Sequence, residues 1–486
     1  MTGSASQITK RRYRDFILCL LMTVFGGIFL LWFIRAAGCD VVYSDYIRIV
    51  EEYLPDVTDP SKFFVPDILT RIPVTFFQRL INVELFHYSV TFDRVCSAMG
   101  LTACALMVGV YMRKEGLSAL WFLPVFAVIF SLNKWEIILN GTSWAHVVSF
   151  ALFFLNYYLL DVWYQRQAGT CGEKSILPVI LYAFPFLMLL FAGEYIASYA
   201  AVMTAAYLFC AVMGKDGGSY RGTIDRKRKC YVTGLLCTLA SLGLYLLSRH
   251  FAVWEHAGAS DLGILEVISS EPLLIPKLFI KSFAGTVLGQ QAITDFYGPM
   301  EPLSEGAVLL IGILVIAIYL TAIVSYTRFG LWRRTLFPMI LMLSGGLNHV
   351  LVTASRWIFL SEDYGLSSRY GAQFMIGVIG IILTAALVFQ ELTERKTRGS
   401  RILREGCIAA ALLFLLGAAY TTRCELSIVP YREQNYERMH QAVLNYHDYE
   451  PEELADILEW GKSEETMLRA LEILEDNRLN VFSYME

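Results

Sequence analysis

Long runs of apolar residues recur along most of the chain and are separated by short polar stretches. A helix needs roughly 20 predominantly apolar residues to cross the hydrocarbon core of a bilayer. The pattern therefore predicts an all-α fold, a polytopic transmembrane bundle of about eleven helices. The predicted spans are 16–34, 95–112, 117–132, 143–163, 176–192, 195–213, 230–248, 306–326, 335–354, 370–390 and 406–420.

The composition supports a membrane protein. Of the 486 residues, 56% are hydrophobic and only 17% are charged, whereas a soluble domain has about 25% charged residues. This excludes a soluble enzyme, a secreted disulfide scaffold, a disordered regulator and a DNA-binding protein, so we expect no nucleic-acid partner.

The positions of the basic residues predict how the chain is oriented. Lys and Arg resist translocation, so segments rich in them stay in the cytoplasm. Four basic residues precede the first span, which predicts a cytoplasmic N-terminus and, after eleven spans, a C-terminus outside. On this division the inner loops are basic and the outer segments acidic, although the net charge is only -4. The four residues are Lys10, Arg11, Arg12 and Arg14.

The polar mass lies mainly in three outer segments, two loops and a C-terminal tail. The tail is acidic and predicted to be helical, with helices that begin at Pro451 and after Ser463. The predicted organisation is a basic N-terminus 1–15, a transmembrane domain 16–420 with outer loops 35–94 and 249–305, and a tail 421–486.

The first outer loop is predicted to contain two amphipathic helices. Apolar residues recur at helical spacing through 44–54, and Pro55 ends this helix. A second helix begins near Pro73, with Phe77 and Ile81 on its apolar face. Helices of this kind can lie in the membrane interface, so membrane lipids are expected partners.

The cysteines and histidines do not predict a metal site. None of the ten cysteines forms a CxxC pair, and the seven histidines lack the spacing of zinc ligands. Cys39 and Cys424 lie just outside the spans, which leaves a disulfide between them open.

Asp40 and Asp45 follow the first span directly. A carboxylate fixed close to a membrane surface is placed to act as a general base on an acceptor hydroxyl within hydrogen-bond reach. We therefore predict that one of these two aspartates is catalytic. The alternative is structural, because Asp45 and the preceding Ser44 are also suited to start and cap the amphipathic helix.

Arg356 and Arg369 flank the loop between the ninth and tenth spans, and Tyr370 follows the second arginine. A guanidinium group donates two parallel hydrogen bonds and so suits phosphate. These three residues are predicted to hold the phosphate of a lipid-linked substrate. The alternatives are ion pairs with Glu362 or Asp363, or contacts with ordinary lipid headgroups.

Ionisable residues inside spans are costly and are functional candidates by default. The span centres are otherwise nearly free of them, and the exceptions are Glu194, His146 and His349. We predict that these residues and Trp144 bind substrate, Trp144 by stacking on a sugar ring. The alternatives are a membrane anchor for Trp144, a packed histidine at 349, where small residues let helices approach, and a structural hydrogen bond for Glu194.

The layout resembles the GT-C superfamily of polytopic membrane glycosyltransferases and, more loosely, bacterial polysaccharide-associated membrane proteins. The resemblance rests on the cytoplasmic N-terminus, the long first outer loop with an early aspartate, about eleven spans and the outer tail. Members use a polyprenyl-phosphate-linked sugar and a catalytic carboxylate in the first outer loop. Many carry adjacent acidic residues there, whereas Asp40 and Asp45 are separated by four residues.

The resemblance implies an enzyme that transfers a sugar from a polyprenyl-phosphate donor to a glycan or lipid acceptor on the outer face of a membrane, here expected to be the bacterial plasma membrane. No cofactor is required, although some members use a divalent cation. The alternatives are a lipid-linked glycan transporter or flippase, a polysaccharide polymerase or ligase, and a non-catalytic envelope assembly protein. Protein partners are not predicted.

Overall fold

The fold is entirely helical in the part of the chain that the structure describes. The structure is a computed structural model in which residues 2–65, 72–166, 175–213, 221–250, 259–294, 302–395 and 398–484 are described. Residues 251–258 and 295–301 of the predicted outer loop 249–305 lie outside these ranges.

Ten of the helices in this part are long and apolar enough to cross a membrane, which makes the chain an integral membrane protein. The prediction of eleven spans is thus confirmed for ten. The remaining one, 176–192, is a 15-residue apolar helix, α8 (Leu177–Phe191). The ten spans are formed by α1 (Thr2–Ala37), α4 (Val90–Glu115), α5 (Phe122–Phe130) with α6 (Trp135–Leu139), α7 (Trp144–Gln165), α9 (Ile196–Met213), α10 (Arg221–Arg249), α14 (Glu305–Arg328), α15 (Phe337–Arg356), α16 (Gly371–Arg395) and α17 (Arg398–Ser427).

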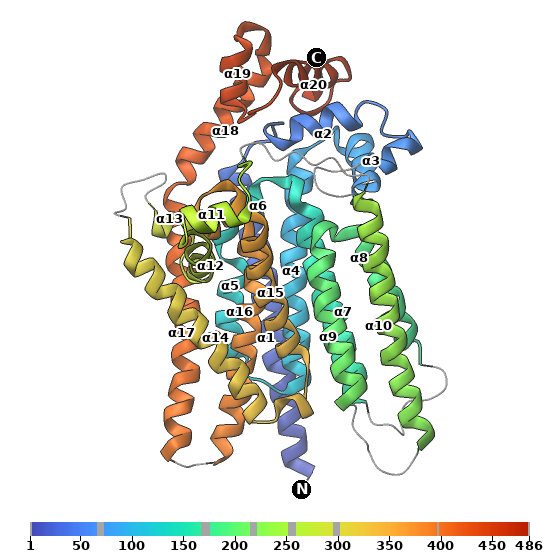
Figure 1. The fold of residues 1–486 in the computed structure, drawn as a ribbon, viewed down its shortest axis with the longest axis vertical. Helices are drawn as coiled ribbons and strands as arrows, with labels where there is room; N and C mark the ends of the chain where they lie inside the picture. Colours follow the sequence, from blue (N-terminus) through green and yellow to red (C-terminus); the bar gives the residue numbers. More distant parts are fainter. Residues whose placement is uncertain are drawn as a thin grey trace.

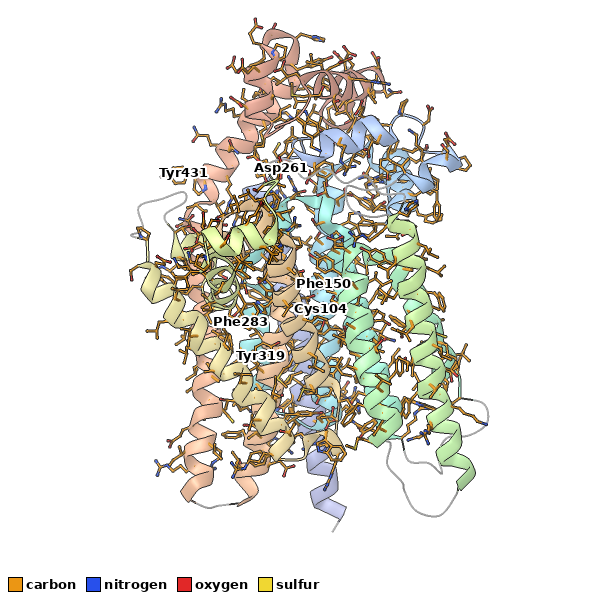
Figure 2. All side chains as sticks on the ribbon, in the orientation of Figure 1. Cys104, Phe150, Asp261, Phe283, Tyr319 and Tyr431 are labelled. Carbon is orange, nitrogen blue, oxygen red and sulfur yellow. The ribbon has the colours of Figure 1, made fainter. Side chains whose placement is uncertain are left out.

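Helix α16 forms the centre of the bundle. In its most apolar stretch 94% of the residues are buried, compared with 22% in α17 and 28% in α14, which run along the outside. Figure 2 shows Cys104, Phe150, Phe283 and Tyr319 inside the bundle, where Cys104 and Phe150 are fully buried. The exposed leucine, isoleucine and valine residues of the outer helices are suited to contact lipid.

The N-terminus and the C-terminal tail lie at opposite ends of the bundle (Figure 1). We refer to these as the N-terminal end and the tail end. The tail folds as helices α18 (Val429–Leu444), α19 (Pro451–Ile457) and α20 (Glu464–Asp476), of which α19 and α20 begin where the sequence predicts. Ser463 caps α20 by accepting a hydrogen bond from the backbone N–H of Thr466. Cys39 and Cys424 are free thiols rather than a disulfide.

Both helices expected in the first loop are present at the tail end, as α2 (Asp45–Tyr53) and α3 (Val74–Phe86). Helix α2 buries its apolar face against α20 and the bundle. Helix α3 is arranged the opposite way, because its buried residues are polar and Phe77 and Ile81 are exposed. Its buried face contacts a polar network, described below.

The second loop contributes three short helices at the tail end: α11 (Ile264–Ser270), α12 (Leu274–Ala284) and α13 (Gln290–Ile293). Helix α12 packs on α14, on α15 and on the turn Glu362–Leu366 between α15 and α16. The loop between α15 and α16, which carries two predicted substrate arginines, is therefore supported from one side by α12.

Helices α15 and α16 approach most closely at two glycines. A Cβ atom at Gly345 would lie 2.3 Å from the backbone nitrogen of Gly377. We predict that Gly345→Ala destabilises the protein by about 1–3 kcal/mol, because the two backbones would have to separate. Thermal unfolding of purified protein, followed by fluorescence, measures this.

The matched control is Gly406→Ala in α17, where an added Cβ meets nothing within 4 Å. This variant should be as stable as the wild type or slightly more stable, since alanine favours helix over glycine. Equal unfolding temperatures for the two variants would contradict the close packing of α15 on α16.

Candidate functional site

Asp40 caps a transmembrane helix. Its carboxylate accepts hydrogen bonds from the backbone N–H of Val90 (2.6 Å) and of Thr91 (3.1 Å) and from the Ser89 hydroxyl (2.6 Å). These donors form the N-terminus of α4, where a carboxylate is stabilised by the helix dipole. Asp40 is thus occupied by a structural role, which leaves Asp45 as the free carboxylate of the predicted pair.

A buried polar network fixes the helix that carries Asp45. The Tyr46 hydroxyl donates to the Asp93 carboxylate at 2.9 Å. Asp93 also accepts hydrogen bonds from the side-chain amides of Gln78 and Asn82 on α3. One carboxylate therefore joins α2, α3 and α4, and explains why the buried face of α3 is polar.

Asp45 lies close enough to Arg369 for their charges to interact. Arg369 donates through Nε to the Glu136 carboxylate, which also accepts from Ser368 at 3.0 Å. This guanidinium donates no other hydrogen bond in the described residues, and 59% of the Arg369 side chain is exposed. Glu459 lies near this guanidinium. Burial raises the pKa of the Glu459 carboxyl, and the negative charge of Glu136 raises it further.

Arg356 lies in the same region and forms no ion pair in the described residues, although Glu194 lies near enough for their charges to interact. Its guanidinium carbon is 5.8 Å from the ring centre of Phe359 and 5.7 Å from that of Tyr370. Its Nε is shielded from solvent and has no hydrogen-bond acceptor in the described residues. The charges of both Arg356 and Arg369 act on Tyr370, so the tyrosine lies near both arginines.

The ion pairs between these arginines and Glu362 or Asp363, which the sequence left open, are not found. Lys281 donates to Glu362 at 2.5 Å and to Asp363 at 2.6 Å, and Lys277 lies 3.2 Å from Glu362. These lysines belong to α12. They neutralise Glu362 and Asp363, so neither acidic residue forms an ion pair with Arg356.

His146 and Glu194 form an ion pair, with 3.3 Å between Nε2 and the carboxylate, beside the ring of Tyr195. The charge of Arg356 acts on Glu194, so this pair borders the arginine region. Trp144 is buried against Ile72 and Ala145, so its ring packs inside the protein and is not open for stacking on a sugar.

His349 is a buried histidine, and the ring of Phe374 lies next to both His349 and Tyr370. The His349 ring is stacked between Phe283 (3.8 Å) and Phe374 (4.0 Å). Its Nδ1 lies 2.8 Å from the Ser282 hydroxyl, and the side chain is fully buried. This geometry matches the structural alternative and does not place the imidazole beside the arginines.

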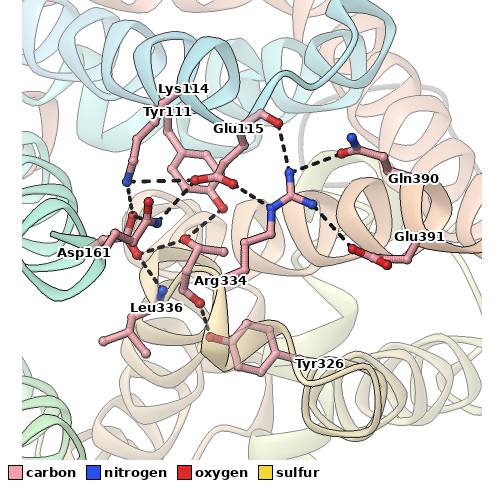
Figure 3. Close-up of polar contacts among 11 residues, drawn as sticks. Tyr111, Lys114, Glu115, Asp161, Tyr326, Arg334, Leu336, Gln390 and Glu391 are labelled. Carbon is pink, nitrogen blue, oxygen red and sulfur yellow. Dashed lines mark hydrogen bonds and ion pairs between the residues drawn. The ribbon is translucent and has the colours of Figure 1, made fainter. Parts of the chain in front are cut away.

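The opposite, N-terminal end contains a second ionic cluster (Figure 3). Asp161 accepts hydrogen bonds from Lys114 (2.7 Å), from the Thr335 hydroxyl (2.9 Å) and from the backbone N–H of Leu336 (2.6 Å). Arg334 lies 2.8 Å from the Glu115 carboxylate. These charges lie at or beyond the ends of the predicted spans, so they leave the span centres nearly free of ionisable residues, as expected.

Sequence reasoning did not assign Glu136 or Glu459 to the site. Glu136 had a signal, because it lies just beyond the predicted span 117–132, beside Lys134 and Trp135. The amine of Lys134 turns inward to three backbone carbonyls at the end of α5, so Glu136 is the residue of this group that reaches Arg369. Glu459 lies in the tail, where no local pattern predicts its neighbour.

The comparisons with known proteins add no relative to this picture, since neither any protein-family model nor any curated protein matches the chain.

The cluster of Lys277, Lys281, Glu362 and Asp363, beside the loop between α15 and α16, should make the stability of the protein depend on pH. Although burial opposes ionisation of Glu362, the hydrogen bonds from Lys281 and Lys277 lower its pKa below the ordinary value. A carboxylate whose pKa is lowered by folding stabilises the protein above its unfolded pKa, about 4.3, and loses that contribution as the pH falls. We predict that Glu362→Gln lowers stability by about 1 kcal/mol near neutral pH, and that the difference shrinks towards pH 3.

Unfolding temperatures of wild type and variant at several pH values test this prediction. The control is Glu405→Gln, which removes an exposed pair with Arg401 and should change stability little at any pH. A constant difference between Glu362→Gln and wild type across the pH range would contradict the assignment.

Proposed function

We propose that the chain is a membrane glycosyltransferase that moves a sugar from a polyprenyl-phosphate donor to a hydroxyl group of a glycan or lipid acceptor. The observation that carries the proposal is Arg356, whose Nε is shielded and without an acceptor, whose guanidinium carbon lies 5.8 Å and 5.7 Å from two aromatic ring centres, and which forms no ion pair in the described residues. An unpaired cation beside Arg369 is suited to bind an anion, and a phosphate accepts the paired hydrogen bonds of a guanidinium well.

The location of this cation favours a lipid-linked phosphate. Arg356 ends the spanning helix α15, and Arg369 and Tyr370 immediately precede α16. A phosphate on a polyprenyl chain would reach this level from the bilayer while its chain stayed among the apolar helices. The basic N-terminus lies at the opposite end of the bundle, which by the positive-inside rule supports an outer location for the arginines.

The chemistry of the proposed step is a single displacement. The arginines hold the phosphate and stabilise the negative charge that develops as its bond to the anomeric carbon breaks. Asp45 accepts the proton of the acceptor hydroxyl, whose oxygen forms the new bond to the anomeric carbon and inverts it. The products are the glycosylated acceptor and polyprenyl phosphate. Glu136 is a positioning residue that orients Arg369 through Nε.

The transport alternative finds less support at the N-terminal end. A path for a polar glycan would need polar groups that are free to line it there. In the described residues these groups are paired instead. Asp161 accepts hydrogen bonds from the Thr335 hydroxyl and the backbone N–H of Leu336, and Arg334 forms an ion pair with Glu115 (Figure 3). Such a paired cluster is suited to hold α4, α7 and α15 together.

We predict that the two arginines and Asp45 separate donor binding from turnover. Arg356→Ala and Arg369→Ala should each weaken donor binding about tenfold or more, since each loses charge-assisted hydrogen bonds. Asp45→Asn should keep donor binding and lower turnover by about 100-fold or more, because it removes the base. Mass spectrometry of protein in lipid nanodiscs, with a panel of polyprenyl-phosphate sugars, measures both quantities.

Two controls sharpen this experiment. Arg401→Ala removes an exposed arginine of α17 and should change neither quantity. Asp40→Ala should lower the unfolding temperature, because α4 loses its cap, but should leave turnover per folded molecule within a few-fold. Full turnover by Asp45→Asn would contradict the role of this carboxylate, and absence of donor binding by folded wild type across the panel would reject the function.

A further inference from the structure

Three side chains with metal-binding atoms meet where the first span joins the tail. Cys39 follows α1, while Glu437 and His440 lie one turn apart on α18. The thiol, one carboxylate oxygen and one imidazole nitrogen all lie within 4.8 Å of one another. This group is separate from the proposed catalytic residues and comes from opposite ends of the chain.

The surrounding contacts fix both sides of this group. The carbonyl oxygen of Cys39 accepts a hydrogen bond from the buried Arg94 guanidinium at 2.6 Å. On α18, the hydroxyl of Tyr436 lies 2.9 Å from that of Tyr43, and Met439 is buried. The backbone positions of Cys39 and α18 are therefore set by neighbouring packing, and a ligand set held in this way binds with less loss of conformational entropy.

The group contains a polar atom that the protein leaves unsatisfied. Nδ1 of His440 is shielded from solvent and has no hydrogen-bond partner in the described residues. A shielded nitrogen without a partner is costly. A cation bound by the imidazole would provide such a partner.

We propose that Cys39, Glu437 and His440 bind one zinc ion, which fastens the tail helix α18 to the end of the first span. Thiolate, imidazole and carboxylate together are a donor set for zinc, whereas Mg²⁺ and Ca²⁺ prefer oxygen ligands alone. Zinc–ligand bonds of about 2.0–2.3 Å require the three atoms to close slightly, which the exposed Glu437 side chain permits. On binding, the thiol releases its proton to solvent, and water completes the tetrahedron.

Sequence spacing does not reveal this set, which is why no metal was expected. Glu437 and His440 form a Glu-x-x-His pair, but the thiol that completes the site is almost a full chain length away. Only the contact of α18 with the end of α1 brings the three residues together.

The experiment uses the full chain, purified, treated with EDTA, reloaded with zinc and freed of excess metal. Elemental mass spectrometry should find about one zinc per chain in the wild type. Cys39→Ser and His440→Ala should each remove most of it. The matched control is His447→Ala, a tail histidine that pairs with Glu475 outside the group, and it should bind as the wild type does.

Cobalt gives a second readout that reports the thiolate directly. Wild type and His447→Ala loaded with Co²⁺ should show the near-ultraviolet charge-transfer absorption of a cobalt–thiolate bond, and Cys39→Ser should lack it. Circular dichroism and gel filtration establish that the variants are folded. Absence of bound zinc in the wild type, or full zinc binding by both folded ligand variants, would overturn the proposal. Neither readout depends on transferase activity.

Discussion

A charge buried within a bundle that is surrounded by hydrocarbon has to find its partner inside the protein, because lipid offers none. This constraint explains most of the polar contacts in the structure. Asp161 is satisfied by Lys114 and the start of α15 at the N-terminal end. Glu425 pairs with Arg432 at the tail end. The Asp161 contacts join helices that are distant in sequence, whereas Glu425 and Arg432 join the consecutive helices α17 and α18.

Arg356 departs from this pattern, because its Nε has no hydrogen-bond acceptor in the described residues. The acidic residues nearest to it in sequence, Glu362 and Asp363, bind Lys277 and Lys281 of α12 instead. Helix α12 thus supports the loop between α15 and α16 and also pairs with its acidic residues. The result is a pair of arginines, one of them without an ion pair in the described residues, at the point where two spans leave the bundle. That arrangement is the physical basis of the proposed phosphate site.

The spans could be predicted from sequence because an apolar run is a local property of the chain. The partners of the charged residues at the candidate site could not, because pairings such as that of Arg369 with Glu136 join distant segments. Asp40 illustrates the difference. Its position after the first span suggested a catalytic base, but its carboxylate accepts hydrogen bonds from the N-terminus of α4. Helix α3 is a second case, since its helical pattern was predicted correctly, whereas its inward polar face depends on Asp93 of α4.

The most direct test of the account is a structure of the protein with an unreactive phosphonate analogue of a polyprenyl-phosphate sugar. We predict that the phosphonate contacts Arg356 and Arg369, that the sugar lies towards Asp45, and that the lipid chain follows the apolar surface of the bundle. An analogue bound at the N-terminal end beside Arg334, or anywhere that leaves Arg356 without contact, would contradict the proposed site.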